Sequence, residues 1–280
     1  MPKETPMVRS IALALSALSL VAIAACTKST ANSGSAITPT GTFSTIRFVA
    51  GSPDANGGGG IDFRVDGTAV FTGLLPSSVT PYFVITPGTH TIEADAAGTA
   101  TKILATTSVT EVTGAQATVV LAGRQTATPS TLQWVQYTEP AYTSLTSQFA
   151  INVHNVSPNL VAAGGSTATF GTYAIPAASS PPSTFTPVAQ ATFPTGGVGT
   201  SVIMNANSTV ASAPGGGFYV VPSSQTPSAT ATPSATLLPS ALDPANNANL
   251  LPYPANSDYH ISLFAIDGPG ATYLLVGHFD

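Results

Sequence analysis

The sequence predicts an all-β protein of two tandem immunoglobulin-like β-sandwich modules, which follow a signal peptide and a flexible tether. From Thr45 onward, short β-branched and aromatic runs alternate with Gly and Pro. No stretch shows an apolar period of 3.6 residues over the length that a helix needs. Short motifs also recur in the same order in both halves of the chain, which indicates a duplicated module.

The first 25 residues are typical of a lipoprotein signal peptide. Lys3 and Arg9 form a basic leader, and residues 11–25 form an uncharged run that ends in small residues. This run is shorter than the roughly 20 apolar residues that a membrane-spanning helix requires, and no basic cluster follows it. We therefore expect the segment to be cleaved.

Ile23-Ala24-Ala25-Cys26 resembles the lipobox of bacterial lipoproteins, in which the cysteine is lipidated and becomes the first mature residue. The resemblance implies that Cys26 carries acyl chains such as palmitate and tethers the protein to a membrane. Several acyl chains give stable anchoring, whereas one chain binds only marginally. The alternative is an ordinary signal peptide that leaves a free thiol. Cys26 is the only cysteine, so it has no disulfide partner within the chain.

Residues 26–41 are expected to be the lipidated cysteine and a flexible linker, because residues 27–40 are rich in Ser, Thr, Ala and Gly without apolar periodicity. The first module is then expected over residues 42–143. Turn signals such as Asp66-Gly67 and Pro87-Gly88 separate its strands. Its expected strands are 45–50, 61–65, 82–86, 89–94, 101–109, 117–122 and 132–137. Seven short strands in about 95 residues is the count of an immunoglobulin-like sandwich, although the marker cysteine pair is missing.

The second module is expected over residues 144–280, because Ser52-Pro53-Asp54 recurs as Ser157-Pro158-Asn159. The offset is 105 residues, and the second motif follows an expected strand at 149–155. Further echoes pair 80–92 with 186–203, 117–122 with 259–266, and 132–137 with 271–279. Residues 222–254 form a Pro/Ser/Thr/Ala-rich insertion that is poorly suited to strands. Chance similarity in a chain of such simple composition is the alternative.

The first module resembles the bacterial family catalogued as domain of unknown function 4397. The segments RFVAGSPDANGGGGIDFRVDGTAVFTGL and PYFVITPGTHTIEADAAGT carry the resemblance, which covers about residues 45–123. The glycine run 57–60 departs from the family pattern, and the second module lacks the paired acids. The resemblance implies a lipoprotein or secreted surface protein with tandem domains, and it implies no activity.

Composition and charge exclude several function classes. Hydrophobic residues make up 43% of the chain and charged residues only 7%, so the chain can bury a core beneath an unusually neutral surface. Removal of Lys3, Glu4 and Arg9 with the leader leaves 5 basic and 11 acidic residues, a net charge of −6. The remaining basic residues are scattered, whereas nucleic-acid binding needs clustered Lys and Arg. We expect no nucleic-acid partner.

The sequence gives no catalytic assignment and implies no cofactor. It contains no H-E-x-x-H, G-x-S-x-G or phosphate-binding glycine motif. A thiolate metal site is excluded by the single cysteine. The four histidines lie on expected strands among apolar or hydroxyl residues and are interpreted as structural or surface groups. They are His90, His154, His260 and His278.

Two sets of side chains are candidates for binding. Asp54, Asn56, Asp62 and Asp66 place four oxygen-bearing groups within thirteen residues, which suits calcium, although Asp before Gly is also ordinary turn chemistry. An aromatic set could stack on a sugar, although alternating strand aromatics usually pack in a core. This set comprises Tyr82, Phe83, Trp134, Tyr137 and Tyr142.

The sequence thus predicts a non-enzymatic binding or structural surface module of the cell envelope, with a protein or glycan partner. It is expected at the outer membrane if the organism has one, because Thr27 stands where many inner-membrane lipoproteins carry Asp. One alternative is a hydrolase-like envelope enzyme whose site lies under the 222–254 insertion near His260 or His278. The other alternative is a carbohydrate-binding module.

Overall fold

The computed structural model describes residues 43–140, 148–164, 167–174, 184–193, 197–198, 200–205, 218–222, 259–270 and 272–279. The signal peptide, Cys26, the tether and Tyr142 lie outside these residues, as does the insertion apart from Pro222. Among the residues described, no helix is long and apolar enough to cross a membrane.

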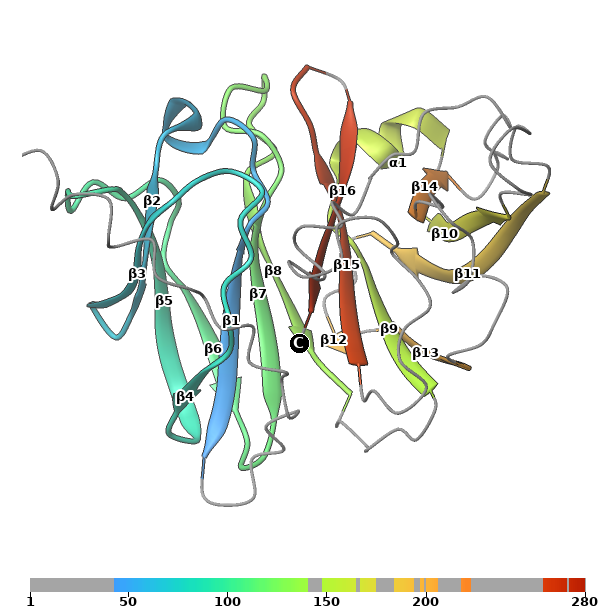
Figure 1. Cartoon of the computed structure of the whole chain (residues 1–280). Helices are drawn as coiled ribbons and strands as arrows, with labels where there is room; N and C mark the ends of the chain where they lie inside the picture. The colour runs from blue at the N-terminus through green and yellow to red at the C-terminus, as the bar shows by residue number, and fades with distance from the viewer. Residues whose placement is uncertain are drawn as a thin grey trace, which may run out of the picture. The chain divides into compact units, whose positions relative to one another are not determined.

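The first module is a sandwich of two sheets, each with four strands from this module, and the short strand β12 (Gly197–Val198) of the second module adds to the end of one of them (Figure 1). One sheet has the order β8-β7-β1-β4, with β1 parallel to β7 and the other neighbours antiparallel. These strands are β1 (Ser44–Ala50), β4 (Phe83–Ile85), β7 (Gln116–Ala122) and β8 (Gln133–Thr138). The other sheet is antiparallel in the order β3-β2-β5-β6. Its strands are β2 (Ile61–Val65), β3 (Thr68–Leu74), β5 (Gly88–Ala96) and β6 (Thr107–Glu111).

Alternating side chains of both sheets fill the first core. Phe48 of β1 and Phe63 of β2 are fully buried and stack with ring centroids 4.7 Å apart and an interplanar angle of 15°. Burying an aromatic ring of this size stabilises the fold by roughly 2–3 kcal/mol. The stack therefore joins the two sheets near the middle of the sandwich.

A tight hairpin joins β2 to β3 at the predicted Asp66-Gly67 turn, although β3 itself was not predicted. Asp66 and Gly67 both have positive φ, 51° and 76°, which is the backbone of a type I′ turn. Such a turn requires the partner strand to begin at once, so β3 starts at Thr68. The strand was missed because β3 lies at a sheet edge and is largely exposed, so its side chains lack a clear apolar alternation.

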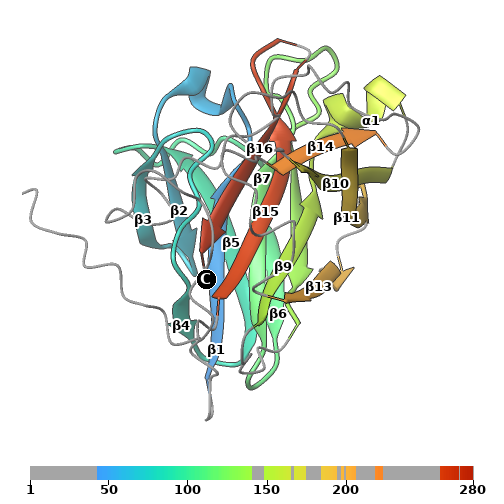
Figure 2. The same ribbon diagram turned by 45° about the vertical axis from the view of Figure 1, so that its right-hand side comes forward.

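The second module repeats the order of the first sheet, and its other sheet has three strands among the described residues. One sheet has the order β13-β9-β15-β16, with β9 parallel to β15 (Figure 2). The other sheet has the order β11-β10-β14. The first sheet contains β9 (Gln148–Asn155), β13 (Thr200–Asn205), β15 (Tyr259–Asp267) and β16 (Tyr273–Phe279). The second contains β10 (Thr167–Ala174), β11 (Thr184–Thr192) and β14 (Phe218–Pro222).

Pairing partners define which strands correspond. β9, β15 and β16 have the neighbours that β1, β7 and β8 have in the first module, as the echoes in sequence predict. The echo between 87–92 and 199–203 does not join corresponding strands. Residues 88–96 form β5, whereas β13 pairs with β9 as β4 pairs with β1. β13 therefore corresponds to β4, and β5 corresponds to β14.

The all-β prediction is confirmed, but the immunoglobulin-like strand order is not. Immunoglobulin constant-type sheets are antiparallel throughout. Here the parallel pairs β1–β7 and β9–β15 lie within the sheets. The described residues also include the helix α1 (Pro158–Gly164), which was not predicted because seven residues are too few to show a helical period.

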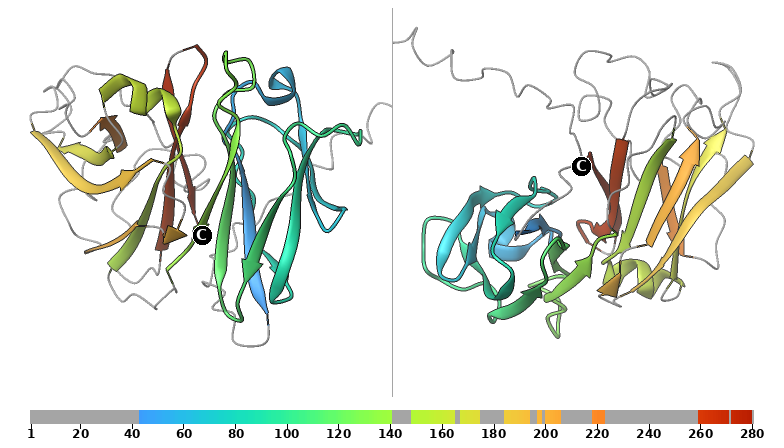
Figure 3. Two further views of the ribbon diagram at one scale, coloured as in Figure 1. Left: turned by 180° about the vertical axis from the view of Figure 1, so that it is seen from behind. Right: turned by 90° about the horizontal axis from the view of Figure 1, so that it is seen from below.

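A third cluster of buried residues joins the modules. It combines Val49, Val120 and Tyr137 of the first module with Phe264 and Ile266 of the second. β12 (Gly197–Val198) adds to this junction, because it pairs in parallel with the end of β8. Seen from below, the blue and green strands enclose one core and the yellow to red strands enclose another (Figure 3).

Candidate functional site

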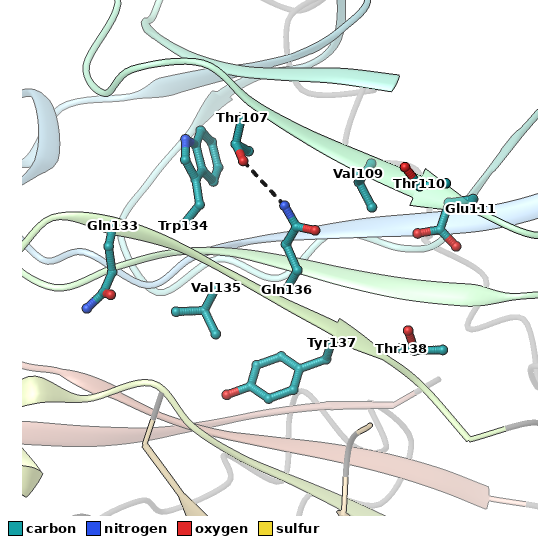
Figure 4. A pocket seen from close by; sticks show the side chains of 10 residues that line it. All are labelled: Thr107, Val109, Thr110, Glu111, Gln133, Trp134, Val135, Gln136, Tyr137 and Thr138. Carbon is teal, nitrogen blue, oxygen red and sulfur yellow. Dashed lines mark hydrogen bonds between the residues drawn. The ribbon is translucent and has the colours of Figure 1, made fainter. Parts of the chain in front are cut away.

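A groove lies at the open edge of the first sandwich, between β6 and β8 (Figure 4). Its volume is about 550 Å³. β6 and β8 border it because each stands at the same side of its own sheet. Ten residues line it: Thr107, Val109, Thr110, Glu111, Gln133, Trp134, Val135, Gln136, Tyr137 and Thr138.

Two side chains of β8 reach across one part of the groove to the backbone of the opposite sheet. The Trp134 indole N–H donates to the Ala105 carbonyl at 2.8 Å, and the Gln136 amide donates to the Ser108 carbonyl at 2.9 Å. Both bonds use backbone acceptors in and beside the edge strand β6. They therefore hold the two sheets together where no strand closes the sandwich, and they leave fewer acceptors for an added peptide strand.

Glu111 is the ionisable group of the groove. Its side chain faces inward at the end of β6, and the residue is 6% exposed. Burial raises the pKa of its carboxyl to about 7, although the neighbouring His90 opposes the shift. Within the described residues, no hydrogen bond satisfies this carboxyl. A buried acid that borders a groove is a candidate binding group, because a ligand could supply a hydrogen-bond donor to its carboxyl.

His90 has both ring nitrogens committed to the protein. Nδ1 lies 2.8 Å from Asp66 Oδ2, and Nε2 lies 2.7 Å from the Thr86 carbonyl. The hydrogen bond to Asp66 is the main reason that the pKa of His90 is raised, against the opposing effect of burial. The same hydrogen bond lowers the pKa of Asp66. His90 is thus a positioned structural side chain, as predicted.

The other polar constellation is sealed between the modules. Arg47 is fully buried, and its guanidinium meets Glu139 at 3.1 Å and the Ser262 hydroxyl at 2.7 Å. Arg47 Nε also donates to the Thr118 hydroxyl at 2.8 Å, and that hydroxyl donates to Glu139. The Tyr82 ring lies 4.6 Å from the guanidinium. Removing either charge would leave the other buried without its counter-ion.

His154 completes this inter-module cluster. It is fully buried and stacks on Phe264 with centroids 4.6 Å apart, while Tyr137 meets it edge-on. Its Nε2 lies 3.4 Å from Glu139 Oε1. His154 was predicted to be a structural or surface group, but the pairing of Arg47 with Glu139 was not predicted. These two residues lie 92 positions apart in the sequence, and no local motif indicates that they meet.

The structure does not gather the predicted calcium ligands. The Asp54 carboxylate accepts the backbone N–H groups of Gln125 and Thr126 and faces Arg124 at 3.5 Å. Burial opposes its ionisation, but the hydrogen bond from the Thr126 hydroxyl, the two backbone hydrogen bonds and Arg124 hold the pKa of Asp54 below its usual value. Asn56 donates to the Gly60 carbonyl. Asp54 and Asn56 therefore fasten two loops.

The other two acids serve other turns. Asp62 accepts the N–H groups of Gly73 and Gly98, and Asp66 accepts that of Thr91 as well as His90. Over the part of the chain that the structure describes, no group of three or more His, Cys, Asp or Glu side chains is placed to hold a metal ion.

The predicted aromatic face is also dispersed. Tyr82 packs on Arg47, Phe83 packs against the first core, and Tyr137 lies at the module junction with its hydroxyl on the Asn155 carbonyl. Trp134 and Tyr137 both border the groove, and the Trp134 indole is hydrogen-bonded there to the Ala105 carbonyl. His260 is 4% exposed on β15, and His278 lies on β16.

Comparisons with known proteins bear on the first module. No curated protein matches the sequence. A solved structure, the Bacillus anthracis TIE protein, is similar over 67% of this chain at 10% identity with a TM-score of 0.22, and the match covers 30% of that protein's chain. The model of the family described as Domain of unknown function (DUF4397) matches residues 44–164, from β1 to α1, which confirms the resemblance of this segment to that family.

Proposed function

We propose that the protein is a non-catalytic binding module of the cell envelope, held to a membrane by lipid on Cys26. One observation carries the proposal. Among the described residues, the buried charged cluster of Arg47, Glu139 and His154 joins the two modules, while His90 and Asp66 pair with each other and hold a turn of the first module. The cluster is buried away from solvent, and the groove offers hydrogen-bonding groups without a nucleophile and base pair.

The sealed cluster also supports a rigid pair of modules. Arg124 of the first module donates to the Gly268 and Gly270 carbonyls in the turn between β15 and β16, so a second contact joins the modules beyond Arg47. A protein that binds a partner away from a bilayer benefits from such rigidity, because fewer interdomain motions must be ordered on binding.

A glycan ligand at the groove is the second candidate, and Glu111 favours it. Hydroxyl donors would satisfy its desolvated carboxyl, and the lining is otherwise uncharged and rich in Thr and Gln. Peptide addition to β6 is disfavoured by the bonds from Trp134 and Gln136. Anionic ligands are disfavoured because no Lys or Arg lines the groove.

Two experiments test these proposals separately. Cell fractionation tests the anchor, since wild type should sediment with membranes and Cys26→Ala should not. Trp134 is the only tryptophan, so its fluorescence reports on the groove. The protein is titrated with three hexasaccharides, one of N-acetylglucosamine, one of β1,4-linked glucose and one of α1,4-linked glucose. At least one of them should shift the emission of Trp134. Glu111→Gln should weaken that response, whereas Glu93→Gln on the outer face should not. No response to any of the three would reject the glycan candidate.

A further inference from the structure

Three exposed apolar side chains gather where the first folded strand begins. In the described residues, five large apolar side chains are more than half exposed, and three of them are Phe43 at 51%, Val84 at 56% and Val112 at 68%. The Phe43 carbonyl accepts the Gly114 N–H at 2.8 Å, and the Ser44 hydroxyl donates to the Val112 carbonyl at 2.8 Å. Phe43 and Val112 are therefore neighbours at one end of the first module.

Val84 belongs to the same end by strand register. Thr45 lies directly opposite Val84 in the β1–β4 pair, so Phe43, two residues earlier, is a diagonal neighbour of Val84 on the same face. We call Phe43, Val84 and Val112 the apolar end. Exposed apolar groups that stand singly need no explanation, whereas neighbouring ones form a candidate docking surface.

The surroundings of the apolar end carry little charge. The adjoining turns at 86–88 and 113–115 contain only Thr, Pro, Gly and Ala. Glu111 beside Val112 is buried. Asp66 is the exposed acid nearby and is hydrogen-bonded to His90, whose other ring nitrogen contacts Thr86. Transfer of this end to an apolar phase would therefore desolvate few charges.

The tether enters at this same end. Phe43 stands seventeen positions after Cys26, and it leads directly into β1. Seventeen residues span at most about 60 Å when extended, so the tether permits several orientations of the module. The apolar end lies where the tether joins the module, so lipid attachment keeps this end at a high effective concentration near the bilayer. Contact of the apolar end with the bilayer would therefore favour one orientation of the module.

We infer that the apolar end docks on the lipid surface to which Cys26 is anchored, so that β1 rises from the bilayer and the groove between β6 and β8 is held at a fixed height. The inference rests on the proposed anchor. Because the nearby charge is small and acidic, the partner is the apolar boundary of a zwitterionic bilayer and not an anionic headgroup.

Quenching by lipid tests this inference on the lipidated protein. In a Trp134→Phe background, single indoles are introduced by Phe43→Trp and Val112→Trp at the apolar end. Matched controls are Leu75→Trp and Ile203→Trp, which replace the other two exposed apolar side chains, 61% and 54% exposed. Leu75 follows β3 at the opposite end of the first module, and Ile203 lies on β13. Each variant is reconstituted into phosphatidylcholine vesicles with brominated or unmodified acyl chains.

Brominated lipid should reduce the emission of the Phe43→Trp and Val112→Trp variants about twofold and leave both controls unchanged, because bromine quenches only indoles at the hydrocarbon boundary. Equal emission in the two lipids for Phe43→Trp and Val112→Trp, in protein that floats with the vesicles, overturns the docking and leaves the anchor standing. Failure of every variant to float overturns the anchor and the docking together. If Trp134→Phe perturbs the fold, an environment-sensitive fluorophore on Phe43→Cys or Leu75→Cys gives the same comparison.

Discussion

Ser52 and Ser157 perform the same task in the two modules. Ser52 Oγ accepts the backbone N–H of Ala55 at 3.1 Å, and Ser157 Oγ accepts that of Leu160 at 3.1 Å. Ser157 stands directly before α1 and caps it, whereas Ser52 closes the turn at 52–55 that precedes the short 3-10 helix at Ala55–Gly58. The recurrence of a Ser-Pro pair at an offset of 105 residues thus has a structural cause, because each hydroxyl accepts the backbone N–H three residues later.

Loss of these two hydroxyls should destabilise the two modules unequally. Ser52→Ala should lower the free energy of unfolding by about 1 kcal/mol, because the buried Ala55 N–H loses its hydrogen-bond acceptor. Ser157→Ala should cost more, roughly 2–3 kcal/mol, because Ser157 also donates to the buried Asp267 at 2.6 Å. Urea unfolding of both variants measures the difference. Equal losses would show that the hydrogen bond to Asp267 contributes nothing.

The buried pair between the modules predicts a non-additive result. Glu139→Gln should destabilise by roughly 3–5 kcal/mol, because Arg47 would stay buried without its counter-ion. Arg47→Met combined with Glu139→Leu should cost less than this single change. Lys102→Met, at the exposed pair with Glu93, should cost under about 1 kcal/mol. A double variant less stable than Glu139→Gln would contradict the role assigned to the pair.

Glu111 predicts a pH dependence of stability. Its folded pKa is raised from 4.5 to about 7, so the folded state holds a proton that the unfolded state releases. Stability should therefore fall as pH rises from about 4.5 through 7. At pH 8 the free energy of unfolding of Glu111→Gln, measured by urea unfolding, should exceed that of wild type by roughly 1–3 kcal/mol. At pH 4 the two proteins should be equally stable.

Glu93 supplies the control of opposite sign. Its hydrogen bond to Lys102 lowers its pKa, so its contribution is present above about 4.5 and is lost as pH falls. Glu93→Gln should therefore cause a small loss of stability at pH 8 and none at low pH. A pH profile of Glu111→Gln parallel to that of wild type would rule out Glu111 as the source of the dependence.

Calcium should leave the melting temperature unchanged. The carboxylates of Asp54, Asp62 and Asp66 are each satisfied by donors from separate loops, so binding a cation would require breaking those hydrogen bonds. Asp54→Asn should lower the melting temperature with or without calcium, since the loop at 124–126 loses its anchor. A calcium-dependent rise in wild type that Asp54→Asn abolishes would instead support a metal site.

The sequence placed most strands of the first module well, and its errors fall at the edge strands β3 and β6. β1, β2 and β7 were placed within a residue or two, because each is a short run of β-branched or aromatic residues between turn signals. The expected strand at 101–109 began too early: β6 starts at Thr107, and Lys102 makes only an isolated bridge to Asp95. Backbone pairing at an edge depends on a neighbour that local composition does not reveal.

The candidate site was less predictable than the fold. Trp134 was named from its residue type, and it does border the groove. Glu111 gave no signal, because its raised pKa arises from burial between two sheets whose packing is a tertiary property. Asp54, Asp62 and Asp66 are close together in the sequence only. Strand β2, which lies between Asp54 and Asp66, places the three side chains in separate parts of the module.

Intact mass spectrometry of detergent-extracted protein tests the central claim, that this is a lipid-anchored envelope module, most directly. The account predicts a mass equal to residues 26–280 plus acyl groups, and no acylated species for Cys26→Ala. An unmodified mass from the soluble fraction of wild-type cells would contradict the anchor. The protein would then be a freely secreted β-sandwich, and the docking of its apolar end on lipid would fall with the anchor.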